Sequence, residues 1–186
     1  TKLLVLTDIH IVEEGADIIG LDPTERFLEV FDHALAHHSD AERIIITGDL
    51  AHFGQRECYH RLKKLLENVK IPVTLMLGNH DRRDTFQSVF GGAGYAQSQV
   101  DFDDMTCVFL DTLAGPPYVK GHHAGLLCDE RLAWLDARLA ASRRVLLFMH
   151  HPPLDTGFDG MDAIKLANAD AFYEIIQRHN CVEHLI

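Results

Sequence analysis

The sequence of 186 residues has no long apolar run, so it contains no candidate for a membrane-spanning helix. It also lacks internal repeats, low-complexity segments and linkers, and we therefore expect a single domain over residues 1–186. Its four cysteines are widely scattered and form no Cys-x-x-Cys pair. This spacing argues against a thiolate zinc site and against a disulfide framework, and it favours free thiols and a cytoplasmic location.

Basic side chains are scarce, since 17 Lys and Arg stand against 28 Asp and Glu and give a formal net charge of −11. Affinity for nucleic-acid polymers rests largely on neutralisation of phosphates by basic side chains, so such a polymer is excluded as the partner. A small phosphate substrate stays compatible, because a bound metal ion can supply the positive charge locally. Histidine is abundant by contrast, with 13 residues, and it is the commonest transition-metal ligand.

The sequence also lacks the motifs of serine and cysteine hydrolases and of phosphate-binding loops. No Gly-x-Ser-x-Gly motif and no reactive-cysteine context is present, which places a serine or cysteine hydrolase last among the alternatives. The Gly-rich stretch at 91–94 is not followed by Gly-Lys-Ser/Thr, so we do not expect a phosphate-binding loop there.

Apolar runs alternate with amphipathic segments in the first half of the chain. The pattern predicts strands over 2–8, 43–49 and 72–79, with helices over 24–38 and 55–69 between them. The nearly continuous isoleucines of 43–49 are typical of a strand buried on both faces. Strand, helix, strand, helix, strand is the order of a parallel sheet with crossover helices.

The second half has a different character. Residues 95–104 and 105–112 predict an antiparallel hairpin, followed by a helix over 129–141 and a buried strand over 143–153. A helix over 168–179 comes next, and a strand begins at 181. Residues 115–125 and 155–162 are expected to be loops, and an exposed loop is favoured over substrate contact for the first. Parallel and antiparallel strands together suggest two sheets with helices outside them.

Polar residues end four of the predicted strands. In open α/β sheets the carboxyl edge of the strands is where sites form. The side chains at these ends are Asp8, His10, Asp49, Asn79, His80, His150 and His151. Carboxylates, an amide oxygen and imidazoles, with no thiolate, suit Mn, Fe, Co or Zn. A carboxylate such as Asp49 can bridge two ions, which is a common device for phosphoryl displacement.

The chain resembles the calcineurin-like metallophosphoesterases, and more closely the bacterial class III cyclic-nucleotide and glycerophosphodiester phosphodiesterases. The resemblance rests on four motifs in order, DIH (8–10), GD (48–49), GNHD (78–81) and HHPP (150–153). It implies a four-layer α/β/β/α sandwich of two mixed sheets flanked by helices, which is the metallo-dependent phosphatase fold. It also implies two metal ions (Fe, Mn, Zn or Co) and hydrolysis of a small phosphodiester by a metal-bridging hydroxide.

The resemblance also implies a role for each site residue. Asp8 and His10 would hold the first metal and Asp49 both metals, while Asn79 and His150 would hold the second. His80 would be catalytic, stabilising the phosphate or protonating the leaving group. Asp81 would support the site by accepting a hydrogen bond from the His80 ring. For His151 two roles stay open, an inner structural hydrogen bond and a substrate contact. His52 follows Asp49 closely, but surface exposure is favoured for it.

The family completes its site with a Gly-His-x-His turn after one further strand, whereas this sequence stops at Ile186 within what looks like that strand. We therefore expect a fragment of a longer enzyme that binds metal more weakly than the complete one. The alternatives are a phosphomonoesterase or a sugar-nucleotide or lipid pyrophosphatase on the same fold, and a catalytically impaired interaction module. Association into a homo-oligomer is left open.

Overall fold

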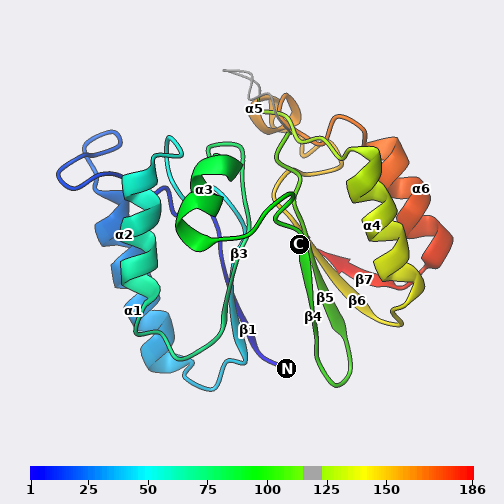
Figure 1. The fold of residues 1–186 in the computed structure, drawn as a ribbon, viewed down its shortest axis with the longest axis horizontal. Helices are drawn as coiled ribbons and strands as arrows, with labels where there is room; N and C mark the ends of the chain where they lie inside the picture. Colours follow the sequence, from blue (N-terminus) through cyan, green and yellow to red (C-terminus); the bar gives the residue numbers. More distant parts are fainter. Residues whose placement is uncertain (115–122) are drawn as a thin grey trace. The chain divides into compact units, whose positions relative to one another are not determined.

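The computed structural model describes residues 1–114 and 123–186, and these fall into two compact units, Thr1–Ala93 and Gly94–Ile186 (Figure 1). Each unit contains one β-sheet with its own helices. That the whole chain forms one domain stays a prediction. No helix in the described ranges combines the length and the apolar character that crossing a membrane requires.

The first unit is built on a parallel sheet in the order β1-β2-β3. Its elements are β1 (Leu3–Leu6), α1 (Pro23–His37), β2 (Arg43–Ile46), α2 (Arg56–Leu66), β3 (Val73–Leu75) and α3 (Arg83–Phe90). The three isoleucines of β2 are fully buried, as predicted for a central strand of a parallel sheet. Asp22 starts α1 by accepting hydrogen bonds from the N–H groups of Thr24 and Glu25.

Helix α3 was not among the predicted elements. It has only eight residues and buries only two apolar side chains, Phe86 and Val89. A single i, i+3 pair is too short a repeat to be separated from loop by periodicity alone. The helix ends at Gly91, whose φ of 85° suits a residue without a Cβ.

The second unit has a four-stranded sheet in the order β4-β5-β6-β7. Its elements are β4 (Ser98–Asp101), β5 (Thr106–Leu110), α4 (Asp129–Ala140), β6 (Val145–Met149), α5 (Asp159–Asp162), α6 (Ala169–His179) and β7 (Val182–Leu185). The predicted hairpin is confirmed, because β4 and β5 are antiparallel, whereas β5, β6 and β7 run parallel. The predicted loop over 155–162 is wrong at its end, where one short helical turn, α5, forms.

Helices α4 and α6 pack on the mixed sheet through one apolar cluster. The fully buried members include Leu135 and Leu139 from α4, Phe172 from α6, and Val108 and Leu147 from the sheet. The predicted helix over 129–141 therefore packs on the sheet through these two leucines. This packing fixes β6, and His150 and His151 follow directly at the carboxyl end of that strand.

Candidate metal centre

The carboxyl ends of β1, β2 and β3 bring the predicted site residues of the first unit together. Backbone hydrogen bonds join the loops after β1 and β2, from Asp8 N to Gly48 O (3.2 Å) and from His10 N to Asp49 O (2.9 Å). Asp8, His10 and Asp49 all have left-handed backbones, with φ of 54°, 43° and 49°. Such values are uncommon outside glycine and are typical of functional sites, where the surroundings hold a strained residue in place.

Asp8, His10 and Asp49 form the core of the site. The Nε2 atom of His10 lies 3.6 Å from Oδ2 of Asp49 and 3.9 Å from Oδ1 of Asp8. Thr7 donates a hydrogen bond from its hydroxyl to Oδ2 of Asp8. The three ligand atoms lie within 4.8 Å of one another, which is close enough for a single ion. Asp49 is only 3% exposed, and a buried carboxylate is costly unless it is paired, hydrogen-bonded or bound to a metal.

Asn79 and His80 enter the same region from the loop after β3. The backbone N–H of His80 donates to Oδ1 of Asp49 (2.8 Å), and Nε2 of His80 lies 4.0 Å from Oδ2 of Asp49. Asn79 is 8% exposed and precedes His80 directly. The structure therefore brings five predicted residues of the first unit together. Around the carboxylate of Asp49 lie Asp8, His10 and His80, and Asn79 directly precedes His80 in the chain.

Asp81 is fully buried and ties the site loops together. Its Oδ2 atom accepts from the N–H groups of Leu50 (3.0 Å) and Gly78 (2.9 Å), and its Oδ1 atom accepts from the Ala51 N–H (3.1 Å) and the Tyr59 hydroxyl (2.8 Å). Burial raises the pKa of Asp81 to about 6, although the backbone hydrogen bonds oppose this shift.

The expected role of Asp81 differs from what the structure shows. We predicted that the Asp81 carboxylate accepts a hydrogen bond from the His80 ring. Instead Nδ1 of His80 lies 2.7 Å from the backbone carbonyl oxygen of His52. The Asp81 carboxylate points to the loop backbone instead, because the N–H groups of two loops converge on it.

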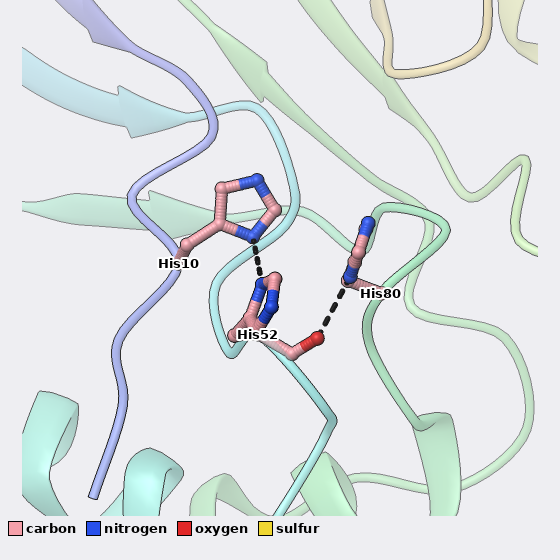
Figure 2. Close-up of side chains that lie close together, drawn as sticks. All are labelled: His10, His52 and His80. Carbon is pink, nitrogen blue, oxygen red and sulfur yellow. Dashed lines mark hydrogen bonds between the residues drawn. The ribbon is translucent and has the colours of Figure 1, made fainter. Parts of the chain in front are cut away.

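His52 is the residue that sequence reasoning missed. Its ring is half-buried rather than exposed, with Nδ1 3.3 Å from Nδ1 of His10 and the ring stacked on that of His80 at 5.1 Å (Figure 2). Desolvation, followed by the nearby rings of His10 and His80, lowers the pKa of His52. The sequence feature that could have indicated this role is the position of His52, three residues after Asp49 on a loop that leaves the same edge of the sheet.

His151 lies in the interior of the second unit. It is 1% exposed, its Nδ1 lies 2.7 Å from the Thr112 hydroxyl, and its Nε2 lies 3.0 Å from the His123 carbonyl oxygen. Burial, followed by the neighbouring His150, lowers the pKa of His151 to about 3. Of the two alternatives, the structure thus favours the inner structural hydrogen bond. That His150 completes the metal centre stays a prediction, because it belongs to the other unit.

Most of the Gly/Pro-rich loop at 115–125 lies outside the described residues. This holds for residues 115–122, so the expectation of an exposed loop there stays a prediction.

The calcineurin-like phosphoesterase family model matches residues 1–185. The chain belongs to this family. It is 43% identical to a "Probable cyclic nucleotide phosphodiesterase" of Rhodopseudomonas palustris, over 99% of this chain and 69% of the relative. It is 29% identical to "3',5'-cyclic adenosine monophosphate phosphodiesterase CpdA" of Pseudomonas aeruginosa, over 94% of this chain and 63% of the relative. The chain thus spans about two thirds of the length of these curated relatives.

The fold of this calcineurin-like phosphoesterase is similar to a solved dimetal phosphatase from Danio rerio. The TM-score is 0.74 at 17% identity, over 98% of this chain and 79% of the other. The likeness confirms the predicted α/β fold, with two sheets and flanking helices, as that of the metallo-dependent phosphatases. The prediction of a calcineurin-like metallophosphoesterase is confirmed by the family match.

Proposed function

We propose that this chain carries the dinuclear metal centre of a phosphodiesterase that hydrolyses a small phosphodiester. The observation that supports this most is the convergence of Asp8, His10 and Asp49 at the carboxyl edge of a parallel sheet. A cyclic nucleotide is the first candidate substrate, because the two relatives named above are described as cyclic nucleotide phosphodiesterases. A glycerophosphodiester is the second.

The donor atoms fit hard to borderline cations. In the first unit, Asp8 and His10 would hold one ion, Asp49 would contact both, and Asn79 would hold the other; that His150 is a further ligand stays a prediction from the sequence. Oxygen and imidazole donors without thiolate suit Mn, Fe, Co or Zn. The half-exposed Asp8 beside the buried Asp49 places two carboxylates around one imidazole, and this excess of negative charge favours a bound cation.

When bound, two such ions draw electron density from the phosphate oxygens and lower the pKa of a water molecule. The part of His80 follows from its ring contacts. Its Nδ1–H donates to the His52 carbonyl oxygen, which leaves Nε2, on the side of Asp49, to take up and release a proton. Nε2 is therefore the atom that we assign to the phosphate or to the leaving oxygen.

Hydrolysis of bis(p-nitrophenyl) phosphate by the purified protein tests the proposal. We expect activity with Mn²⁺ or Co²⁺ and its loss in excess chelator. Asp49→Asn removes a charge from the centre and should lower activity by at least about 100-fold. Asp84→Asn, at a carboxylate that is 74% exposed, is the matched control and should leave activity unchanged. Undiminished activity in excess chelator would overturn the proposal.

The alternatives differ in the substrate that is cleaved. A phosphomonoesterase would hydrolyse p-nitrophenyl phosphate faster than the diester, and a pyrophosphatase would prefer a sugar nucleotide. Rates with 3',5'- and 2',3'-cyclic nucleotides separate the two cyclic candidates. Binding of Mn²⁺ without turnover of any of these substrates would favour an interaction module.

A further inference from the structure

Two atoms of His52 lie within hydrogen-bond distance of the two imidazoles of the proposed centre. Its ring Nδ1 lies 3.3 Å from Nδ1 of His10, and its backbone carbonyl oxygen lies 2.7 Å from Nδ1 of His80. Figure 2 shows these two contacts as dashed lines, one ending on the ring and the other on the carbonyl group of the same residue.

The other ring nitrogen of each imidazole faces the same carboxylate. Nε2 of His10 lies 3.6 Å and Nε2 of His80 lies 4.0 Å from Oδ2 of Asp49. A neutral imidazole carries one N–H and one lone pair, and only the lone pair binds a cation. His10 can therefore offer Nε2 to an ion only when its proton is on Nδ1, and the acceptor for that proton is Nδ1 of His52.

The backbone and the neighbouring rings keep His52 in place. Its N–H donates to the Ile11 carbonyl oxygen (3.1 Å), which fixes the loop after β2 against the loop after β1. Its ring stacks nearly parallel to that of His80, at 17°, and meets the ring of His10 edge to face, at 75°. These contacts leave Nδ1 of His52 directed at Nδ1 of His10, where it can accept the His10 proton when its own proton is on Nε2.

We propose that His52 is a positioning residue that sets the tautomers of both His10 and His80, an inference that rests on the proposed metal centre. The ring of His52 holds the proton of His10 on Nδ1, and its carbonyl group holds the proton of His80 on Nδ1. In both imidazoles Nε2 is then free of its proton and faces Asp49. Partners of this kind typically change metal affinity by about 10- to 100-fold when they are removed.

Two substitutions separate the acceptor from the ring. His52→Phe keeps a stacking ring but has no acceptor, whereas His52→Asn keeps an acceptor close to the position of Nδ1 without the ring. We expect His52→Phe to weaken Co²⁺ binding, measured by calorimetry without substrate, by about 10-fold, and His52→Asn to stay within about 3-fold of wild type. His60→Phe, at an exposed histidine of α2, is the control and should change nothing. Equal losses in His52→Phe and His52→Asn, or none in His52→Phe, would overturn the proposal.

A measurement on the unmodified protein loaded with diamagnetic Zn²⁺ is independent of these variants. At a pH of about 8, above the usual histidine pKa, long-range ¹H–¹⁵N correlation spectra report the tautomer of each neutral ring. We expect the proton on Nδ1 in His10 and His80, and on Nε2 in His52. A proton on Nδ1 of His52 or on Nε2 of His80 would refute the inference even if the protein binds metal and hydrolyses diesters. Conversely, the expected tautomers in a protein without activity would refute only the proposed function.

Discussion

Replacing Asp81 by Asn tests how the loops of the site are held together. The Asp81 carboxylate accepts from three backbone N–H groups, those of Leu50, Ala51 and Gly78, and from the Tyr59 hydroxyl. Asparagine has nearly the same shape, but only one of its two terminal atoms is an acceptor. Its NH₂ group must therefore face donors at one of the two positions.

The two orientations of the amide differ in cost. With NH₂ at the position of Oδ2, the N–H groups of both Leu50 and Gly78 lose their acceptor. With NH₂ at the position of Oδ1, only the Ala51 N–H loses it, because the Tyr59 hydroxyl can rotate and accept. An unpaired buried donor costs about 1–3 kcal/mol. Removal of a buried charge offsets part of the loss, so we expect Asp81→Asn to lower the free energy of unfolding by about 2 kcal/mol at neutral pH.

Urea unfolding followed by circular dichroism measures this difference. The matched control is Asp84→Asn, whose carboxylate is 74% exposed and should change the free energy of unfolding by less than about 0.5 kcal/mol. If Asp81→Asn is as stable as the control, the four hydrogen bonds do not hold the loops and the reasoning is refuted.

Two further predictions concern the second unit. Gly125→Ala should lower the free energy of unfolding by about 1–3 kcal/mol in the same assay, because the new Cβ would lie 2.6 Å from Cβ and Cγ of the buried His151. An unchanged midpoint of urea unfolding would contradict this prediction. Alkylation of Cys128 by iodoacetamide should be half-maximal near pH 7. Burial raises the pKa of this thiol, but several contacts outweigh burial and lower the pKa to about 7. Its hydrogen bond to Tyr95 (3.3 Å) is one of these contacts. The buried Cys58, whose pKa burial raises to about 11, should stay unmodified there, and a midpoint for Cys128 above about pH 8.5 would show that the thiolate is not stabilised.

Much of the fold could be predicted because it depends on local patterns. The isoleucines of β2, the amphipathic period of α4 and the hairpin of β4 and β5 each follow from short-range spacing of apolar residues. Helix α3 could not be predicted, since two buried side chains in eight residues give no clear period.

The order of the strands also placed Asp8, His10, Asp49, Asn79 and His80 at one edge, because parallel strands end together. The sequence by itself therefore determined which side chains could form the centre. Only the tertiary structure decided how they are supported: Asp81 accepts from the backbone of two loops, and His52 contacts both imidazoles. These contacts join residues that are distant along the chain and depend on loop conformations, which the spacing of residue types does not encode.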